Sequence, residues 1–440
     1  MQHRIPLDAA TSKATLRLVP FLFLLYIVAY LDRINVSFAA LTMNADLGLS
    51  QTAYGLGAGI FFLGYVLFEV PSNLILERVG PRLWITRIML TWGLVTMATA
   101  LARGPLSFAL LRFALGAAEA GFFPGVILYL TYWFPQATRA RTVALFMTAT
   151  PVAGLVGSPV SGLILGMHGA LGLHGWQWLF LLEGVPAVVL GVLVFLWLPD
   201  RPSRAGWLAA EECAALEGVL AAENRAIAGS HMSSLRQGLT GPRVWLLGWV
   251  YFCAVVAMYG LVMWLPQIIA HAGGGGTMAV SCQVMVAYFF AAVGMVLIGA
   301  SSDRFAERRW HVAGSLALCM AGMLVLSVST GVVAILAGAS LAAMGIWGVL
   351  GPFWGLATAF LTGSAAAAGI ALINSLGNLG GFAGPYVMGW VKTNSGDFSD
   401  GFLFLAGLML LGALPILFLK TASHMPSGVS PGLDDRQGHG

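Results

Sequence analysis

Residues 16–41, LRLVPFLFLLYIVAYLDRINVSFAAL, form an apolar run that carries Asp32 and Arg33 side by side. About 20 apolar residues are enough to cross a bilayer as a helix. A charged side chain inside the bilayer costs about 2.5–3.5 kcal/mol even on lenient insertion scales. The stretch therefore predicts a membrane-spanning helix whose two charges are kept for a function.

Composition extends this prediction to the whole chain. Of the 440 residues, 58% are hydrophobic and 9% are charged, against about 25% charged in soluble domains. The chain is therefore predicted to be an all-α polytopic membrane protein with little room for a soluble catalytic domain. Its four cysteines are scattered and indicate neither a disulfide framework nor a metal site. Because the sequence has no nucleotide-binding loop, metal-ligand cluster or nucleophile motif, we expect no cofactor and no catalytic residue.

The apolar stretches predict twelve spans in two sets of six, separated by one long polar segment. The first set is expected near 16–41, 52–76, 83–102, 106–133, 141–167 and 175–198, and the second near 243–270, 279–301, 311–330, 333–359, 366–393 and 401–420. The expected organisation is a cytoplasmic segment 1–15, a six-helix bundle 16–198, a linker 199–242 with a short helix at 207–225, a second bundle 243–420 and a disordered tail 421–440. Pro352 is expected to interrupt the tenth span.

The distribution of Lys and Arg predicts the orientation in the membrane. Of these 22 residues, Arg33 and Arg112 fall within spans, and Arg103 and Lys392 fall in loops on one side. The other 18 fall on the side of the N-terminus, and such an excess marks the cytoplasmic side. We expect a multi-pass protein of a bacterial inner membrane with both termini in the cytoplasm.

The two halves repeat at a spacing of 226 residues. Glu77-Arg78-Val79-Gly80-Pro81-Arg82 follows the second span, and Asp303-Arg304-Phe305-Ala306-Glu307-Arg308-Arg309 follows the eighth. Arg17 and Arg243, each just before the first span of its half, have the same separation. A six-plus-six repeat with matching cytoplasmic turns is typical of transporters in which two bundles rock against each other. Small residues with helical spacing, namely Gly154, Ser158 and Gly162, and Gly377 and Gly381, predict close helix packing.

Further charged residues lie inside other predicted spans: Glu69, Arg112, Glu119 and Glu183. Arg112 and Glu119 are seven residues apart, so they share one helix face about 10 Å apart along the axis. Buried cations and buried acids spread over several spans indicate a path for an anion and for protons.

The two-bundle plan, the central loop and the repeated acidic–basic turns resemble the major facilitator superfamily over about residues 15–420. Five motifs resemble its anion:cation symporter branch, whose members carry tartrate, sugar acids, sialic acid and aromatic acids: YLDRIN (30–35), FEVPSN (68–73), RFALGAAEAGFFPG (112–125), WFP (133–135) and NSLGNL (374–379). The first turn departs from the family form, because Glu77 replaces the usual Asp and Ser72 or Asn73 stands where Gly is usual.

This resemblance implies roles for several residues. Asp32 and Glu119 are implied as proton-coupling carboxylates, Arg33 as the anchor of a substrate carboxylate, and Tyr30 and Tyr65 as substrate contacts. The alternative for the charged residues is a static ion pair that holds the first and fourth spans together.

The remaining site residues follow from their positions. We interpret Arg112 as an electrostatic regulator of Glu119, and the alternative is a side chain that reaches the membrane surface. Asn374 and Asn378 share a helix face and could bind substrate or another helix. Glu69 is expected at a gate or a helix cap, and Glu183 has no derived role. The repeated turns are expected to act as a gating latch formed by Glu77, Arg78, Arg82, Asp303, Arg304 and Arg308.

Together these features predict a secondary active transporter that takes up a small organic carboxylate with protons by alternating access. A facilitator-type exporter of drugs or metabolites remains the alternative, whereas an intramembrane enzyme lacks a supporting motif. The expected partners are an organic anion, protons and lipid, with no nucleic acid, and the chain is expected to act as a monomer. Similarity of 353–369 to tartrate and aromatic-acid permeases leaves the substrate open.

Overall fold

The structure of the chain, a computed structural model, describes residues 4–228, 240–360 and 364–419. Every regular element in these ranges is a helix, so the predicted all-α architecture is confirmed. The first half holds α1 (Arg4–Asp46), α2 (Gln51–Val79), α3 (Pro81–Thr99), α4 (Pro105–Glu119), α5 (Phe122–Thr131), α6 (Gln136–Met147), α7 (Ala149–Leu165) and α8 (Gly175–Trp197). The second half holds α11 (Pro242–Val262), α12 (Leu265–His271), α13 (Thr277–Phe305), α14 (Arg309–Val328), α15 (Val332–Gly348), α16 (Leu350–Phe360), α17 (Ser364–Ser395) and α18 (Ser399–Phe418).

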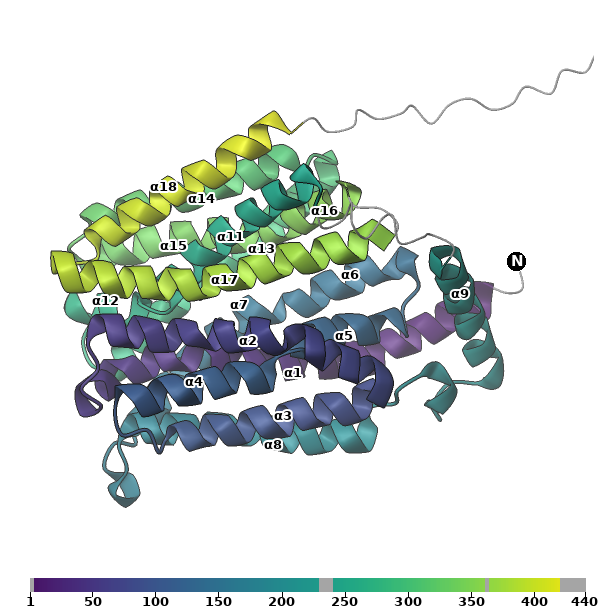
Figure 1. Cartoon of the computed structure of the whole chain (residues 1–440), viewed down its shortest axis with the longest axis horizontal. Coiled ribbons are helices and arrows are strands. Elements are labelled where there is room, and N and C mark those ends of the chain that lie inside the picture. The colour runs from purple at the N-terminus through teal and green to yellow at the C-terminus, as the bar shows by residue number, and fades with distance from the viewer. Residues whose placement is uncertain (1–3, 229–239, 361–363, 420–440) are drawn as a thin grey trace, which may run out of the picture.

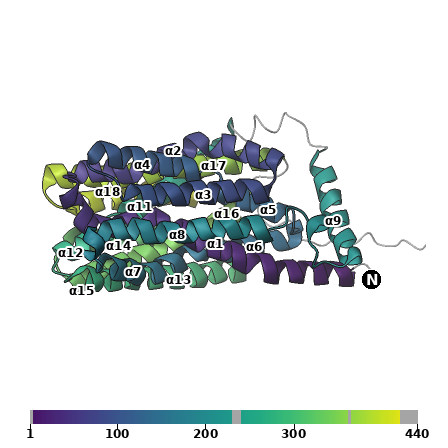
Figure 2. The ribbon, with the colours of Figure 1, turned by 90° about the horizontal axis from the view of Figure 1, so that it is seen from below.

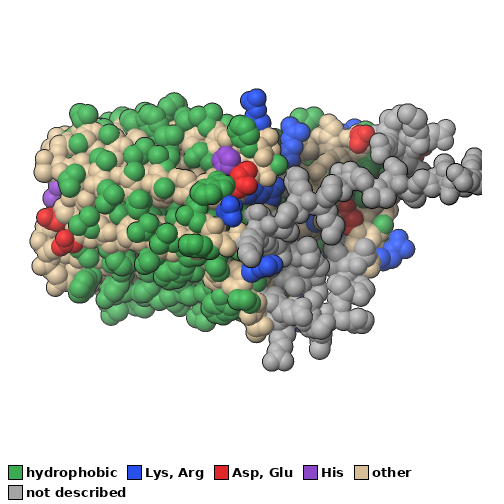
Figure 3. Space-filling model, turned by 90° about the horizontal axis from the view of Figure 1, so that it is seen from above, with side chains coloured by type: hydrophobic (Ala, Val, Ile, Leu, Met, Phe, Trp, Pro, Cys, Tyr) green, Lys and Arg blue, Asp and Glu red, His purple; other side chains and the backbone are tan. Residues whose placement is uncertain are grey.

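The helices of each half form one bundle, and the two bundles lie side by side (Figure 1). Ten segments of the described chain are long and apolar enough to cross a membrane. The basic α3 and the long α17 complete the predicted set of spans, because both run along the other helices (Figure 1). On the face seen in Figure 3, hydrophobic side chains cover much of the bundle, and Lys and Arg gather toward one end. We call this the basic end, where α1 begins and the α2–α3 and α13–α14 turns lie.

The linker between the halves forms α9 (Ala210–Ala228), which confirms the helix predicted at 207–225. Figure 2 shows α9 standing across the basic end, next to the first turns of α1. Ala10 packs there against Leu216 and Leu220, and Lys13 Nζ lies 2.7 Å from Glu212 Oε1. The hydrogen bond from Lys13 lowers the pKa of the Glu212 carboxyl. The predicted tail, 421–440, and linker residues 229–239 lie outside the described residues.

Four predicted spans are interrupted, and three of these breaks were not predicted. The spans expected as continuous at 106–133, 141–167 and 243–270 are split at Ala120–Gly121, Thr148 and Met263–Trp264. The break after Gly348 confirms the interruption predicted from Pro352. Each break is followed by a proline. Pro151, Pro266 and Pro352 come four residues after the last residue of the preceding helix, and Pro124 comes four residues after Ala120, the C-cap of α4. Since proline lacks the N–H that would bond the carbonyl four residues earlier, each break falls at that carbonyl.

Proline alone does not decide a break, because Pro71, Pro159 and Pro385 stand inside continuous helices. At the α4–α5 break a second feature contributes. Gly121 has φ +87°, and a Cβ there would lie 2.3 Å from Ser72 Oγ. The backbone therefore turns at Gly121 in a conformation and a space that favour glycine.

The two bundles meet along α2 with α17 and along α7 with α13. Gly154 of α7 lies against the ring of Tyr288, and Gly381 of α17 lies against Phe62. These contacts confirm the close packing predicted from small residues at helical spacing.

Candidate functional site: a buried ion pair beneath an aromatic cavity

Arg33 lies about two thirds of the way along α1 and forms the centre of the site. Its Nη2 donates to Oε1 of Glu119, the last residue of α4. Its Nη1 donates to Tyr259 Oη of α11, in the other bundle, over 3.4 Å. The Arg33 guanidinium therefore joins an acid of its own half to a hydroxyl of the opposite half.

The α4 break places Glu119 at a helix C-terminus. The dipole of a helix disfavours a carboxylate at this end, and Glu119 is fully buried. Arg33 supplies the compensating charge. Glu119 Oε2 and Arg33 Nε still have no hydrogen-bond partner among the described residues, so the pair keeps unused hydrogen-bonding capacity.

Arg112 is fully buried two turns before Glu119 on α4. None of its three guanidinium nitrogens has a hydrogen-bond partner in the described part of the chain. The Phe61 ring lies between the two arginines, with its centroid 5.1 Å from Cζ of Arg112 and 5.4 Å from Cζ of Arg33. The alternative in which Arg112 reaches the membrane surface is wrong, because its side chain is inside the bundle. Its role as a regulator of Glu119 stays a prediction.

Asp32 lies on a different face of α1 from its neighbour Arg33. It is 1% exposed and accepts from Trp92 Nε1 over 2.5 Å and from Asn35 Nδ2 over 3.3 Å. Glu183 of α8, also buried, accepts from Ser161 Oγ over 2.7 Å. Neither carboxylate has an ion-pair partner within the described ranges.

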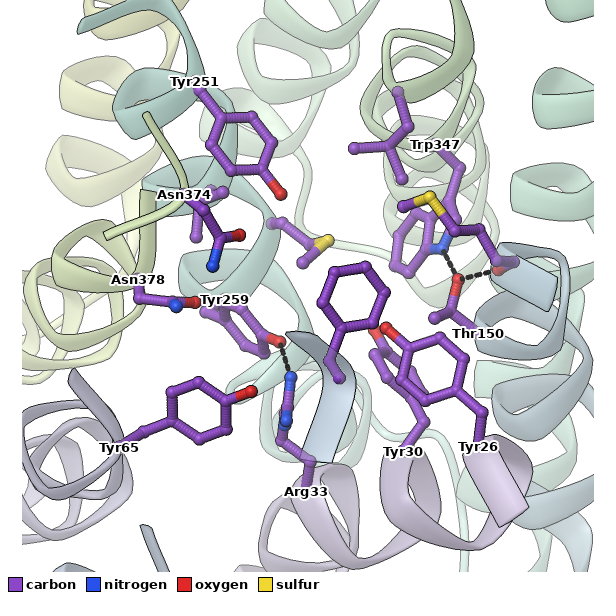
Figure 4. Close-up of a pocket in the computed structure, with 15 residues that line it drawn as sticks. Tyr26, Tyr30, Arg33, Tyr65, Thr150, Tyr251, Tyr259, Trp347, Asn374 and Asn378 are labelled. Atoms are coloured by element: carbon purple, nitrogen blue, oxygen red, sulfur yellow. Dashed lines mark hydrogen bonds between the residues drawn. The ribbon is translucent and has the colours of Figure 1, made fainter. Parts of the chain in front are cut away.

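A cavity opens above Arg33 between the two bundles (Figure 4). The space inside it that the centres of water-sized molecules can occupy is about 60 Å³. Its walls are Tyr26, Tyr30, Arg33, Tyr65, Phe123, Met147, Thr150, Tyr251, Val255, Met258, Tyr259, Trp347, Leu350, Asn374 and Asn378. Both bundles contribute, and the bond from Trp347 Nε1 to Thr150 Oγ1, 3.1 Å long, crosses between them. The few polar groups that converge on this otherwise largely apolar cavity are typical of a site for a small ligand.

The four residues predicted to contact substrate beside Arg33 all line this cavity: Tyr30, Tyr65, Asn374 and Asn378. The two asparagines are also engaged with Glu69. Asn374 Nδ2 donates to Glu69 Oε1 over 2.9 Å, and Asn378 Nδ2 donates to Oε2 over 3.4 Å. Glu69 belongs to α2 and the asparagines to α17, so this contact links the two bundles.

The residues predicted as a gating latch lie at the basic end in two groups, one per bundle. Arg82 donates its backbone N–H to Asp200 Oδ1 and its Nε to the Phe195 carbonyl. Arg308 Nη1 donates to the Gly355 carbonyl. Glu77, Arg78, Asp303 and Arg304 are exposed. The contacts of Arg82 and Arg308 thus stay near their own bundle, and a latch between the bundles stays a prediction.

At the opposite end, hydrogen bonds connect the bundles directly. Thr52 Oγ1 lies 2.7 Å from Thr393 Oγ1, Asn44 Nδ2 donates to Gln267 Oε1 over 3.2 Å, and Tyr54 Oη donates to the Met263 carbonyl over 2.8 Å. The structure is therefore held closed at the end away from α9.

Residues 22–385 match the family model of the Major Facilitator Superfamily. The chain belongs to the major facilitator superfamily. It is therefore a multi-pass membrane transporter and not an enzyme.

Two relatives and one solved structure are similar to this chain over nearly its whole length. A protein of Agrobacterium vitis named "Putative tartrate transporter" is 50% identical over 411 residues, 93% of this chain and 91% of that protein. The "Quinolone resistance transporter" of Acinetobacter baumannii is 44% identical over 400 residues, 91% of this chain and 92% of that protein. The crystal structure of a bacterial homolog to the human lysosomal transporter Spinster shares the fold, with a TM-score of 0.72, 17% identity, and coverage of 91% of this chain and 95% of that one.

The sequence did not predict several residues that line the cavity, notably Tyr26, Thr150, Tyr251 and Tyr259. Tyr259 could have been found, because it stands 226 residues after Arg33, the repeat spacing of the two halves. The others carry no signal of their own, since a tyrosine or threonine in a span is usually a packing residue.

Proposed function

We propose that this chain is a proton-coupled symporter that brings a small organic carboxylate into the cell by alternating access. The buried Arg33–Glu119 pair at the cavity wall carries this proposal. A guanidinium offers a planar fork that fits a carboxylate. A substrate carboxylate can therefore replace Glu119 as the partner of Arg33, with Tyr30, Tyr65, Asn374 and Asn378 as further contacts. The tartrate name of the Agrobacterium relative supports an organic anion.

Coupling to protons follows from the burial of Glu119. Once a substrate holds Arg33, an ionised Glu119 has lost its hydrogen-bonded cation, and a buried unpaired charge is costly. Glu119 then takes up a proton, and an O–H bond forms as the ion pair breaks. When the substrate leaves, Glu119 loses the proton and pairs with Arg33 again. Arg112, which lies on the same helix and has no hydrogen-bond partner among the described residues, favours that release by its charge. Asp32 is the second proton-coupling carboxylate of this proposal.

Alternating access needs one end to close as the other opens. The contacts of Thr52, Asn44 and Tyr54 must break for the end away from α9 to open. Glu69, one turn from Tyr65 toward the basic end, bridges the bundles through two asparagines. We assign Glu69 to a gate there, and the turns with Glu77 and Asp303 to the latch that opposes it.

The excess of Lys and Arg supports a cytoplasmic basic end, and therefore a protein of the bacterial inner membrane with both termini in the cytoplasm. We expect a monomer that contacts lipid through its apolar surface. Fusions of a periplasm-dependent reporter after Arg103 and after Arg204 test the orientation, and only the first should be active.

Reconstitution in proteoliposomes tests the function. Benzoate, gluconate and tartrate are added separately outside, and a trapped dye reports internal pH. At least one carboxylate should acidify the lumen, a protonophore should abolish its accumulation, and Arg33→Lys should abolish the response. No carboxylate-induced proton flux from a correctly folded preparation would contradict the proposal.

The name of the Acinetobacter relative favours a second candidate, export of a drug in exchange for protons. The same vesicles separate the two functions, because a symporter moves substrate and protons in one direction and an antiporter moves them in opposite directions. Loading with ciprofloxacin and imposing an inward proton gradient should leave its efflux unchanged if symport is correct.

A further inference from the structure

Among the described residues that line the cavity, one side chain is cationic. Arg33 is the only Lys or Arg among its described lining residues. The second half adds none, because 244–302 and 310–391 contain no Lys, Arg, Asp or Glu at all. The other buried cation of the first half, Arg112, is not part of the cavity wall. The charge available to a ligand is therefore one guanidinium.

One guanidinium satisfies one carboxylate, through a two-pronged hydrogen bond. A second carboxylate on the same ligand would lie in the cavity without a cation, and an unpaired charge is costly to bury. Glu69 at the cavity edge would add repulsion, since its carboxylate bonds Asn374 and Asn378 at the wall. The cavity therefore discriminates against dianions.

Half of the other lining residues are aromatic, and they come from both bundles: Tyr26, Tyr30, Tyr65 and Phe123 from the first, and Tyr251, Tyr259 and Trp347 from the second. In the first half Tyr26 stacks on Phe146 with a centroid distance of 4.5 Å, and Phe123 lies 5.5 Å from Tyr26. In the second half Tyr251 stacks on Phe353 at 5.1 Å. Trp347 completes the wall beside Thr150, as Figure 4 shows. Aromatic rings attract one another beyond the area they bury, so these walls favour a flat ring over a saturated one.

Uncharged hydrogen-bonding groups complete the site. Tyr30 Oη is buried at the cavity wall with the Tyr288 hydroxyl as a neighbour, and Figure 4 shows Tyr30 beside Tyr26. A hydroxyl on the ligand could hydrogen-bond to this group, whereas a charged group would find no counter-ion there.

We propose that the substrate is an aromatic monocarboxylate, a ring with one carboxylate and otherwise uncharged polar substituents. This inference rests on the proposed function, since it assigns Arg33 to the substrate carboxylate. The proposed substrate also differs from tartrate, the compound in the name of the Agrobacterium relative, because tartrate carries two carboxylates and no ring.

A matched series of ligands tests the inference on the purified wild-type protein. 4-Hydroxybenzoate has one ring and one carboxylate, terephthalate adds a second carboxylate at the far end of the ring, and cyclohexanecarboxylate keeps the charge but removes the ring. We expect terephthalate and tartrate to bind at least about 100-fold more weakly than 4-hydroxybenzoate, and cyclohexanecarboxylate about 2- to 10-fold more weakly. Calorimetry gives the affinities, and proton flux in proteoliposomes shows which ligands are carried.

A charge-adding variant tests the same point from the side of the protein. Met258 lines the cavity, and Lys has a similar length, so Met258→Lys should raise the affinity for terephthalate at least tenfold. Met258→Gln has a similar length without charge and should not. The wild-type ligand series decides the question even if Met258→Lys does not fold.

The outcomes separate this inference from the proposed function. Equal binding of terephthalate and 4-hydroxybenzoate, both lost in Arg33→Lys, would overturn the monocarboxylate assignment and leave the symporter standing. Equal binding of cyclohexanecarboxylate would overturn the preference for a ring. Absence of any carboxylate response would instead overturn the proposed function.

Discussion

The two bundles share one architecture but differ in the charged residues that their spans contain. The bounds of α2 and α13 differ by 226 residues at both ends, and the fourth span of each bundle is interrupted, after Glu119 in one and after Gly348 in the other. Yet Asp32, Arg33, Glu69, Arg112, Glu119 and Glu183 all belong to the first bundle. The spans of the second bundle have no charged residue at 244–302 or 310–391.

The position equivalent to Arg33 makes this difference concrete. It is Tyr259, and the two side chains hydrogen-bond across the cavity. Where the first bundle holds a cation, the second holds a neutral hydroxyl that donates or accepts without a charge of its own. The repeat thus fixes the helices, while the charged side chains inside the spans belong to the first bundle and the second presents an uncharged, partly aromatic surface to the cavity.

The largest effect is expected from Arg33→Lys. Lysine keeps the charge but loses the planar fork, so substrate binding should fall at least about 100-fold, given the roughly 3 kcal/mol of charge-assisted hydrogen bonds. Calorimetry on purified protein measures the affinity. Arg309→Lys makes the same exchange outside the cavity and should bind normally. Normal affinity in Arg33→Lys would remove Arg33 from the substrate site.

Glu119→Gln should separate binding from coupling. The amide cannot release a proton, so the variant should bind and exchange substrate but fail to accumulate it against a gradient. Proteoliposome uptake with and without a pH gradient shows both properties. Glu211→Gln on α9 is the control for a carboxylate outside the bundle. Full gradient-driven accumulation by Glu119→Gln would leave Asp32 as the remaining candidate carrier.

Tyr259→Phe removes the contribution of the second bundle to Arg33. Loss of one hydrogen bond of about 0.5–1.5 kcal/mol should weaken substrate binding about 3- to 10-fold, while the number of protons per substrate stays the same. Tyr386→Phe, whose ring stacks on Phe382 instead, should not change affinity. A changed proton ratio in Tyr259→Phe would mean that coupling extends into the second bundle.

The two basic-end turns allow a direct comparison of the bundles. If they form a latch, Asp303→Asn and Glu77→Gln should each slow transport several-fold with little change in affinity, because the turns lie about 20 Å from the midplane by helix rise. Binding and uptake must be measured on the same preparation. Variants that lose affinity and rate together would argue against a latch.

The smallest effect is expected from Glu183→Gln. Glu183 has no ion-pair partner in the described structure, and a glutamine keeps an acceptor for Ser161. Uptake should therefore stay within about twofold, whereas Glu183→Ala leaves buried groups unpaired and should lower the free energy of unfolding by about 1–3 kcal/mol. Loss of coupled uptake in Glu183→Gln, with binding intact, would place Glu183 on the proton path.

The sequence by itself determined the membrane class, the number of spans, the basic end and the repeat. These features depend on local composition and on spacing along the chain, because a span is an apolar run of fixed length and loop charge sets its direction. The break at Pro352 was predictable in the same way. The breaks before Pro124, Pro151 and Pro266 were not, because a proline such as Pro71 can also sit inside a continuous helix.

Only the tertiary structure decided which charges meet. Asp32 and Arg33 are neighbours in sequence, but successive residues of a helix point about 100° apart, so Asp32 turns toward Trp92 and Arg33 toward the cavity. Arg112 and Glu119 share a helix face, yet Glu119 pairs with Arg33, which comes from another helix. Partners that belong to different helices are chosen by how the helices pack, and no spacing within one helix contains that information.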